Sequence, residues 1–206
     1  MTDNLLIIFA KYPEAGQVKT RLAAKLGDTE AVRIYRACTE LVISAAFPVD
    51  MNEYAAAIAC WPPEKIQAMK EWLGPSMKVF SQQGHDLGSR MHNAFTDGLA
   101  EGYQKIIIIG ADCPAVTHEL IMRAFACLDN AAVVIGPATD GGYYLIGLRH
   151  PIATLFEGIS WGSDRVCEQT LSHCLALNIP CALLPELRDI DRSEDLEYYR
   201  QKGLIL

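Results

Sequence analysis

The chain has 206 residues, half of them apolar, which suits one compact domain or a domain with a small lobe. Its formal net charge of -7 argues against nonspecific binding to nucleic acid, and no apolar stretch reaches the ~20 residues of a membrane-spanning helix. The N-terminus lacks the basic region and cleavage site of a signal peptide, and the seven cysteines form no C-x-x-C pair. We therefore expect a single domain over residues 1–206 in a reducing cytoplasm, without nucleic-acid or membrane partners.

Basic residues concentrate near the N-terminus and acidic residues near the C-terminus. Six of the 18 Lys and Arg residues lie in the first 36 positions, and the segment 186–197 is rich in Asp and Glu. Such a division suits a site that holds a polyphosphate together with its metal ion. The six basic residues are Lys11, Lys19, Arg21, Lys25, Arg33 and Arg36.

A strand and a basic loop open the chain. The apolar run Leu5–Phe9 predicts a buried first strand, after which Pro13 and Gly16 force an irregular loop. A helix is expected to begin near Lys19 or Thr20, and its free N–H groups, with the basic side chains around them, would hold phosphate oxygens. This is not a Walker A loop, because the first glycine of that motif is absent. The alternative is a solvated basic loop.

Helices and strands alternate through the next part of the chain. Asp28 and Thr29 are candidate caps of the second helix. The spacing of apolar residues predicts helices at Glu30–Phe47, from Pro62 to about Leu73 and up to about Tyr103, with strands at Tyr54–Cys60 and Met77–Ser81.

A loop with two glycines and several polar side chains follows the strand that ends at Ser81. Gly84 and Gly88 leave room for a ligand, so we expect this loop to contact a nucleobase or a ribose. The alternative is that His85 and Asp86 cap the helix that follows.

Four consecutive isoleucines, followed by an aspartate, occupy the middle of the chain. The run from Lys105 is too apolar for a half-exposed strand and predicts a central strand of a parallel sheet, covered on both faces. Gly110 lets the backbone turn, and Asp112 lands just past the carboxyl end of the strand, where open α/β sheets bind their ligands. A carboxylate there can hold Mg²⁺ and, through it, a phosphate. The alternative is a turn or helix-capping aspartate.

A tight turn with two adjacent glycines, Asp140–Gly142, follows a helix at Thr117–Leu128 and a strand at Ala131–Ile135. Because adjacent glycines allow close approach to the backbone, we interpret the turn as part of an acceptor site. The alternative is a plain hairpin with Tyr143 or Tyr144 in the core.

The last quarter of the chain supplies a second set of acids. Trp161 and Ser163 precede a helix at Asp164–Leu177, with Ser163 or Asp164 as its cap, and the start of this helix is a candidate site for an anionic acceptor. The alternative is that Trp161 is only a packing residue. After a strand at Cys181–Leu184, Asp189 and Asp191 flank an isoleucine before the final helix. Helix capping accounts for one or two of the acids in this segment but not for this pair.

The order of elements and the acidic residues at strand ends predict both fold and chemistry. Strands alternate with helices, which predicts a three-layer α/β/α sandwich with a mostly parallel sheet and one antiparallel excursion at the Asp-Gly-Gly hairpin. A basic loop, a mid-chain carboxylate and a late carboxylate pair suit Mg²⁺-assisted chemistry on a nucleotide, in which the protein mainly positions the reactants.

Six motifs, in order over nearly the whole chain, resemble one family. It is the DUF2064 family, described as glycosyltransferases, of the nucleotide-diphospho-sugar transferase (GT-A-like) superfamily. The chain looks more distantly like 2-phospholactate guanylyltransferase and the molybdenum-cofactor nucleotidyltransferases. The motifs are F-A-K-Y-P-E-A-G-Q-V-K-T-R-L, Q-G-H-D-L-G-S-R-M, I-G-A-D-C-P, G-P-A-T-D-G-G-Y-Y-L-I-G-L, W-G-S-D-R-V and D-I-D-R-S-E-D-L.

The resemblance implies a GT-A-like fold with a nucleotide site at the carboxyl edge of the sheet. Lys19 and Asp112 are the expected catalytic residues. Asp112 and Asp191 are the expected ligands of Mg²⁺ or Mn²⁺, with Asp189 as the alternative to Asp191. Nucleotide contacts are expected from Lys11, Gly16, Lys19, Thr20, Arg21, Gly84, Asp86 and Gly88, and acceptor contacts from Asp140, Gly141, Gly142, Tyr143, Trp161 and Ser163.

Three functions are compatible with the sequence. The first is Mg²⁺-dependent nucleotidyl transfer from an NTP to a small phosphorylated or carboxylated acceptor, which Lys19 and Arg21 favour because they suit a triphosphate. The second is glycosyl transfer from a nucleotide-diphospho-sugar on the same scaffold. The third is a catalytically silent nucleotide-binding module. The sequence does not fix the oligomeric state, and a homodimer is compatible with it.

Overall fold

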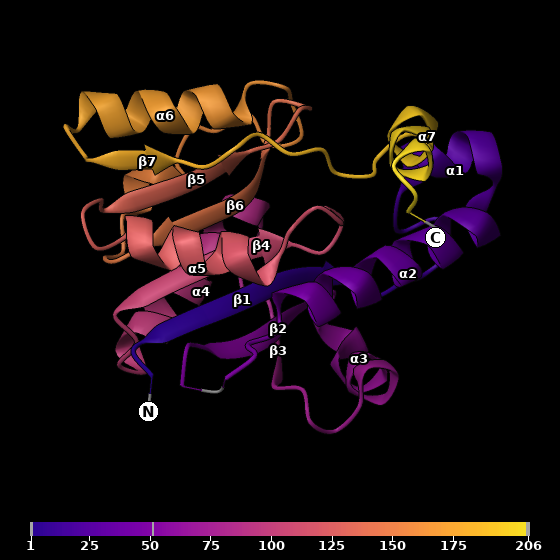
Figure 1. Ribbon diagram of the computed structural model, residues 1–206, viewed down its shortest axis with the longest axis horizontal. Coiled ribbons are helices and arrows are strands. Elements are labelled where there is room, and N and C mark those ends of the chain that lie inside the picture. Colours follow the sequence, from indigo (N-terminus) through magenta and orange to yellow (C-terminus); the bar gives the residue numbers. More distant parts are fainter. Residues whose placement is uncertain (1, 51, 205–206) are drawn as a thin grey trace.

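In the computed structural model, which describes residues 2–50 and 52–204, seven strands form one sheet: β1 (Asn4–Lys11), β2 (Ala55–Trp61), β3 (Val79–Ser81), β4 (Lys105–Gly110), β5 (Val133–Pro137), β6 (Tyr143–Leu148) and β7 (Cys181–Leu183). The strands lie in the order β3-β2-β1-β4-β6-β5-β7. The four-isoleucine strand is thus the central one, as the sequence predicts. The helices are α1 (Thr20–Leu26), α2 (Asp28–Ala46), α3 (Ile66–Leu73), α4 (Leu87–Ala100), α5 (His118–Cys127), α6 (Val166–Ala176) and α7 (Ser193–Gln201), with 3₁₀ turns at Pro63–Lys65 and Ala153–Leu155 (Figure 1).

One strand runs against the others. β6 is antiparallel to both β4 and β5, whereas the remaining neighbours pair in parallel. The Asp140–Gly142 turn joins β5 to β6, so the predicted mostly parallel sheet with one antiparallel excursion is confirmed. As a result, the carboxyl ends of β1, β4, β5 and β7 and the tip of the β5–β6 hairpin all reach the same edge of the sheet.

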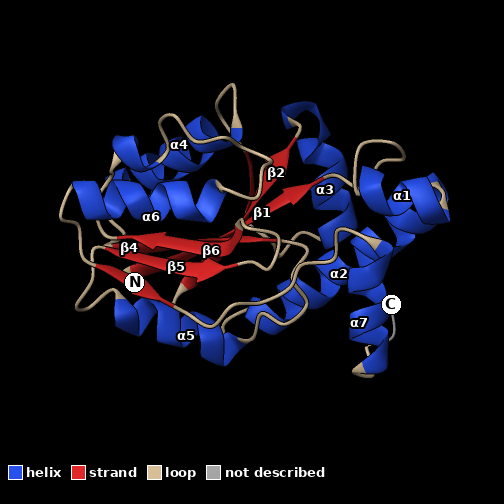
Figure 2. Ribbon diagram, turned by 90° about the horizontal axis from the view of Figure 1, so that it is seen from above, coloured by secondary structure: helices blue, strands red, loops and turns tan. Residues whose placement is uncertain are grey.

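Helices cover both faces of the sheet, which gives the predicted three layers (Figure 2). Because successive strand residues point to opposite faces, Leu6 and Ile8 pack with α2 and α5, whereas Leu5 and Ile7 pack with α4 and α6. The isoleucines of β4 divide in the same way. All seven cysteines are free and five are buried, where they pack as small apolar residues.

The beginnings of two helices differ from the sequence prediction. Asp28 lies inside the first turn of α2 rather than capping it, because α2 begins at Asp28, two residues before the predicted Glu30. Ser163 does not cap α6 either; its Oγ accepts a hydrogen bond from the backbone N–H of Arg165 at 3.2 Å, and the helix begins after Arg165. Helix starts depend on local loop geometry, which apolar spacing does not encode.

Two buried side chains of α2 hold the loops that leave β1 and β4. The Tyr35 hydroxyl accepts a hydrogen bond from the backbone N–H of Lys11 at 2.9 Å and donates to the carbonyl of the same residue at 3.2 Å. One turn further along, Thr39 Oγ1 donates to the carbonyl of Ala111 at 3.3 Å. One helix thereby fixes the ends of both strands relative to each other. Among the described helices, none combines the length and the apolar composition needed to cross a bilayer.

Candidate active site

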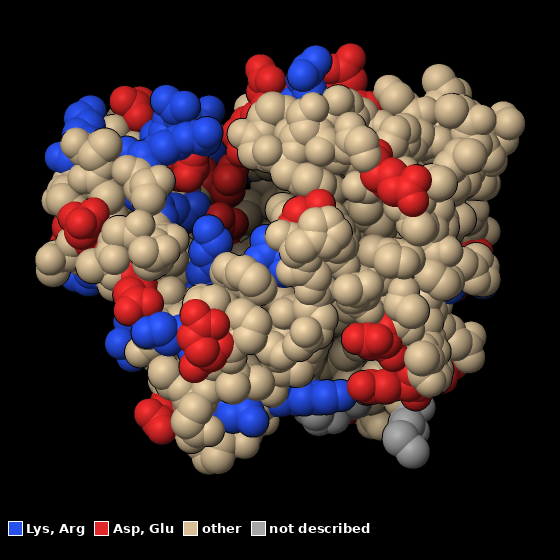
Figure 3. Space-filling model, turned by 180° about the vertical axis from the view of Figure 1, so that it is seen from behind, with Lys and Arg blue, Asp and Glu red and all other residues tan. Residues whose placement is uncertain are grey.

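A cavity of about 440 Å³ lies at the carboxyl edge of the sheet. Its walls come from the ends of β1, β2 and β4, from the loop before α1 and from the start of α4. Figure 3 shows basic and acidic side chains gathered around a hollow in one face of the molecule. Open α/β sheets bind ligands at this edge, so the fold and the cavity point to the same place.

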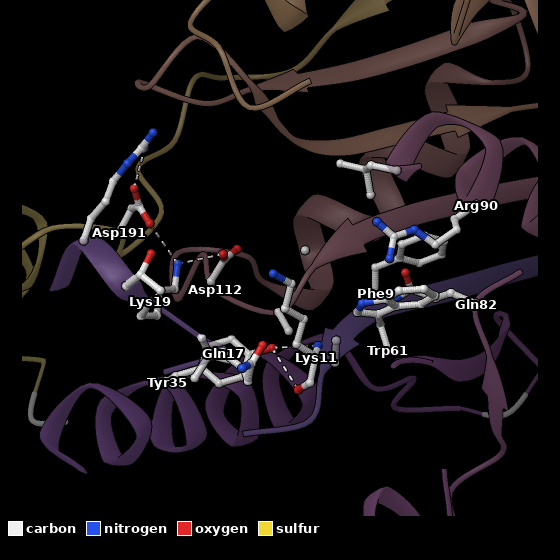
Figure 4. A pocket seen from close by; sticks show the side chains of 17 residues that line it. Phe9, Lys11, Gln17, Lys19, Tyr35, Trp61, Gln82, Arg90, Asp112 and Asp191 are labelled. Atoms are coloured by element: carbon white, nitrogen blue, oxygen red, sulfur yellow. Dashed lines mark hydrogen bonds and ion pairs between the residues drawn. The ribbon is translucent and has the colours of Figure 1, made fainter. Parts of the chain in front are cut away.

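Four charged side chains from three distant parts of the chain meet at one end of the cavity (Figure 4). The Lys19 ammonium lies 2.8 Å from Asp112 Oδ2 and 3.9 Å from Asp191 Oδ1. Arg21 Nη1 lies 2.8 Å from the other oxygen of Asp191. The structure thus brings together the basic loop, the carboxylate after β4 and the late acid, as the sequence predicts. Their catalytic and metal-binding roles remain predictions.

The approach of Asp191 to Asp112 has a local cause. The backbone N–H of Ile190 donates to the carbonyl of Asp112 at 2.9 Å, and the Ile190 side chain is buried in the core. Asp195 caps the following helix, because its Oδ2 accepts from the backbone N–H groups of Asp191 and Arg192 at 3.2 and 2.8 Å. Because Asp195 accepts the hydrogen bonds of these N–H groups, the Asp191 carboxylate can face Lys19 and Arg21.

Lys19 is held in an unusual backbone conformation. Its φ of 50° and ψ of 45° are left-handed, a region that costs free energy for a residue with a side chain. The side chain is only 8% exposed. Burial by itself would lower the pKa of Lys19, but the carboxylates of Asp112 and Asp191 outweigh it and hold that pKa above its ordinary value. The ammonium is therefore a permanent positive charge at this end of the cavity.

Asp189 differs electrostatically from its neighbour two residues on. Burial, and then the charges of Asp112 and Asp140, raise the pKa of the Asp189 carboxyl to about 7, although Lys19 acts in the opposite direction. Asp189 does not line the cavity that holds Lys19; it lines an adjoining one. The geometry therefore favours Asp191 over Asp189 as the partner of Asp112.

The raised pKa of Asp189 predicts a pH-dependent stability. An unfolded aspartate titrates near ~3.9, whereas folded Asp189 titrates at about 7. Between these values the folded state keeps a proton that the unfolded state has lost, so the contribution of Asp189 to stability is full below pH ~4 and is lost as the pH rises to about 7. In chelator, the melting temperature of Asp189→Asn minus that of the wild type should grow between about pH 4.5 and about pH 7.5. A difference that does not change with pH would contradict this prediction.

The opposite end of the cavity is flat and aromatic. Phe9, Trp61, Gln82 and Arg90 gather there, with Lys11 between them and the charged cluster (Figure 4). The Arg90 guanidinium lies 4.1 Å from the centre of the Trp61 ring. The Lys11 ammonium forms no ion pair with any described carboxylate. The cavity thus runs from a stacked pair at one end to a carboxylate–lysine cluster at the other.

The loop before α4 reaches this end, although not through the residues expected from the sequence. Gln82, Leu87 and Arg90 line the cavity, whereas Gly84, Asp86 and Gly88 do not. Asp86 caps α4 by accepting a hydrogen bond from the backbone N–H of Ser89 at 2.7 Å, which is the alternative that the sequence left open. Position 88 has no room for a side chain, because a Cβ atom on Gly88 would lie 2.7 Å from the Trp161 ring. Nucleotide contacts by these three residues stay predictions.

A second cavity of about 440 Å³ adjoins the first and shares Arg21 and Asp191 with it. Asp140 and Ser163, two of the expected acceptor residues, line it. The remaining lining residues include Thr139, Asp164, Arg188, Asp189, Arg192 and Asp195. Two of the six residues expected to contact an acceptor thus line this cavity, and their role in acceptor binding stays a prediction.

The other four expected acceptor residues contact neighbouring parts of the protein and not the second cavity. A Cβ atom on Gly141 would collide with the backbone of Asp164, so the group that approaches this glycine closely is the turn before α6. Gly142 donates its backbone N–H to Asp140 Oδ1 at 2.8 Å. The Tyr143 hydroxyl points into the core, 3.9 Å from Met91 Sδ, and burial raises its pKa. Gly141, Gly142, Tyr143 and Trp161 do not line the second cavity.

Tyr35 and Trp61 line the cavity but are not among the residues that the sequence assigns to the site, whereas Gln82 and Arg90 belong to the segment after Ser81 where a nucleobase contact is expected. Trp61 follows an apolar run directly, so the rule that ligands bind at strand ends could have found it. Tyr35 lies within an ordinary amphipathic helix. Its place in the site depends on long-range packing, which leaves no local signal.

Two carboxylates with hard oxygen atoms converge on Lys19, and this donor set suits a small divalent cation. Mg²⁺ is commonly bound by one or two carboxylates, with substrate phosphates and waters as its other ligands. Within residues 2–50 and 52–204, no three His, Cys, Asp or Glu side chains form a ready metal-binding cluster. The other ligands of such a cation would come from waters and from a bound substrate. Asp112 and Asp191 are the residues that would hold the cation.

Comparison with solved structures gives the same fold. A protein from Desulfovibrio desulfuricans G20 with the provisional name nucleotide-diphospho-sugar transferase is 32% identical, with 98% of this chain and 88% of that chain covered and a TM-score of 0.90. CMP:2-keto-3-deoxy-manno-octonic acid synthetase in complex with CTP is 12% identical, with 97% of this chain and 98% of that chain covered and a TM-score of 0.58. Rv0371c of Mycobacterium tuberculosis H37Rv in complex with manganese is 13% identical, with 99% of this chain and 100% of that chain covered and a TM-score of 0.54. The latter two show the fold alone.

Family comparison agrees with the structural one. A search of curated proteins by sequence finds no match. The family model described as "Uncharacterized protein conserved in bacteria (DUF2064)" matches residues 49–163, which is more than half of the chain. The family model matches more than half of the chain, and the relative that is 32% identical aligns with 98% of it. The protein therefore belongs to the DUF2064 family and has the nucleotide-diphospho-sugar transferase fold.

Proposed function

We propose that this protein is a divalent-metal-dependent nucleotidyltransferase that transfers a nucleotidyl group from an NTP to a small phosphorylated or carboxylated acceptor. The observation that carries the proposal is the convergence of Lys19, Asp112 and Asp191 at one end of a cavity on the carboxyl edge of the sheet. A lysine set against two carboxylates is the arrangement expected for a triphosphate that brings its own Mg²⁺ or Mn²⁺. The structural relatives that bind CTP and manganese support this assignment at the level of fold.

The reaction exchanges one phosphorus–oxygen bond for another. An acceptor oxygen attacks the α-phosphorus of the NTP, the bond from that phosphorus to the bridging oxygen breaks, and pyrophosphate leaves with the bonding electrons. A cation bound by Asp112 and Asp191 would offset the charge of the phosphates. Lys19, which stays protonated, adds a fixed positive charge beside them. Lys11, midway along the cavity and unpaired among the described carboxylates, is placed to bind a further phosphate oxygen.

The second cavity is the proposed acceptor site. Arg21 and Arg188 are already paired with Asp191 and Asp195, at 2.8 and 3.2 Å. Arg192 forms no ion pair with any carboxylate in the described ranges, so it is available for a phosphate or carboxylate on the acceptor. The aspartates that line the same cavity would accept hydrogen bonds from acceptor hydroxyl groups. An acceptor oxygen that is already ionised needs no general base.

Glycosyl transfer is the second candidate, because the relative that is 32% identical carries the name of a nucleotide-diphospho-sugar transferase. Both reactions use a nucleotide and a metal ion but release different products. Nucleotidyl transfer releases pyrophosphate from an NTP, whereas glycosyl transfer releases an NDP from a nucleotide sugar.

Product analysis distinguishes the two reactions. We expect pyrophosphate on incubation with the four NTPs, Mg²⁺ and a panel of phosphorylated and carboxylated hydroxy compounds, and none after addition of a chelator. Release of NDP from nucleotide sugars, without pyrophosphate from NTPs, would replace the proposal by glycosyl transfer. A catalytically silent module would give neither product.

A further inference from the structure

The stacked pair at the aromatic end of the cavity is held rigidly. The Arg90 guanidinium lies 4.1 Å from the centre of the Trp61 ring, and its Nε donates to the backbone carbonyl of Asp86 at 3.1 Å. No described carboxylate forms an ion pair with Arg90. Both Trp61 and Arg90 line the cavity. A planar cation is therefore fixed at the wall, with Trp61 on one face and one hydrogen bond at its edge.

Gln82 places an unpaired acceptor beside this pair. The side chain is buried, with 5% exposed, yet it lines the cavity. Its Nε2 donates to the backbone carbonyl of Ala59 at 2.8 Å. Because a carbonyl can only accept, the amide nitrogen must face Ala59, and this fixes the direction of Oε1. Oε1 receives no hydrogen bond from the part of the chain that the structure describes, and Figure 4 shows Gln82 next to Trp61 and Arg90.

We propose that Gln82, Trp61 and Arg90 form a nucleobase subsite. The base stacks on the Arg90–Trp61 pair, and an N–H group on its Watson–Crick edge donates to Gln82 Oε1. A flat stacking surface with a hydrogen-bond acceptor at its border matches a flat heterocycle that carries N–H groups. A sugar hydroxyl could also donate to Gln82 Oε1, but a sugar ring is not planar and would not stack fully on the guanidinium.

The position of the subsite agrees with the rest of the cavity. Trp61 and Arg90 lie at one end, Lys11 lies midway, and Lys19 with Asp112 lies at the other end (Figure 4). A nucleotide bound along the cavity would have its base on the stack and its phosphates beside the lysines. The inference rests on the proposed function for the phosphate end, whereas the base end is argued from its own geometry.

The chain contains a matched control for the stack. The Arg36 guanidinium lies 5.1 Å from the centre of the Trp72 ring, but Arg36 also pairs with Glu40 at 3.2 Å and does not line the cavity. Arg90→Lys and Arg36→Lys both keep the charge and remove the planar group. Only the first should affect a base.

Calorimetry with three kinds of ligand tests the subsite. The ligands are the four NTPs with Mg²⁺, inorganic tripolyphosphate with Mg²⁺, and the four free nucleosides. We expect Arg90→Lys and Gln82→Met each to weaken binding of the preferred NTP and its nucleoside by roughly 10-fold or more. Tripolyphosphate affinity should not change in either variant, and Arg36→Lys should bind all ligands as the wild type does.

The outcomes separate the two proposals. Equal losses for NTPs and tripolyphosphate, unchanged NTP affinity in both variants, or a wild type that binds tripolyphosphate but no nucleoside would overturn the nucleobase subsite. A wild type that binds nucleosides through Gln82 and Arg90 but not tripolyphosphate would support the subsite and contradict the proposed nucleotidyl transfer.

Discussion

Asp112→Asn is expected to reduce metal-dependent turnover by roughly 10³-fold, because it removes one of the two charges proposed to hold the cation. Asparagine has nearly the same shape as aspartate, and its carbonyl can still accept a hydrogen bond from Lys19, which lies 2.8 Å from Asp112 Oδ2. The fold should therefore survive, with a melting temperature within about 4 °C of the wild type. Steady-state kinetics over a range of Mg²⁺ and Mn²⁺ concentrations, together with thermal unfolding, would measure both effects.

A second ion pair on the same strand provides the control. Lys105, at the opposite end of β4, pairs with Asp129 on the surface. Asp129→Asn breaks a lysine–aspartate pair without touching the cavity and should keep full turnover. If Asp112→Asn retained full metal-dependent activity, Asp112 would not be a metal ligand.

Lys19→Gln is expected to change metal affinity and turnover in opposite directions. In the free protein the Lys19 ammonium lies against both Asp112 and Asp191, so it competes with a cation for the same oxygens. Without that charge, Mn²⁺ alone should bind roughly 10-fold more tightly, a gain of about 1.4 kcal/mol. Turnover should fall by roughly 10²-fold, because a fixed charge beside the phosphates is lost. Manganese titration by paramagnetic relaxation and steady-state kinetics measure the two quantities.

Lys105→Gln, which removes a lysine from the distal pair with Asp129, should alter neither quantity. A Lys19→Gln variant that lost manganese affinity along with activity would argue against this competition. It would point instead to a role for Lys19 in keeping the two aspartates in place.

The sequence predicts most of the fold and the charged end of the site, for physical reasons. Two apolar runs contain no polar residue that could face solvent: Leu5–Phe9 and the four isoleucines of β4. Both strands therefore lie between two layers of helices. Once both strands are parallel, the residues after them must share one edge. The shared edge lets the sequence alone predict that the basic loop lies near Asp112.

The sequence leads us to expect a nucleobase at the loop after Ser81, but the part played by Trp61 and the arrangement of the acceptor side could not be predicted in the same way. The Arg90–Trp61 contact joins a helix to a strand end 29 positions earlier, and only the packing of α4 on the sheet brings them together. Gly141 lies in a predicted turn, but the sequence does not reveal that this glycine packs against the backbone of Asp164, just before α6. Tyr143 begins a strand whose alternation could point it either way, and it turns towards the core. In each case a tertiary contact decides the role.

The antiparallel course of β6 has a consequence for how this scaffold can diversify. A hairpin joins β5 to β6, so its tip projects at the functional edge without a crossover helix to anchor it. Hydrogen bonds between Ala138 and Gly142 and between Gly141 and Ala138 close the tip on itself. The N–H of Thr139 donates to the carbonyl of Leu187 at 2.9 Å, so an insertion there would break this contact. A change of side chain at Asp140, which lines the second cavity, would instead leave the β5–β6 pairing intact, which makes this position the natural place to alter an acceptor preference.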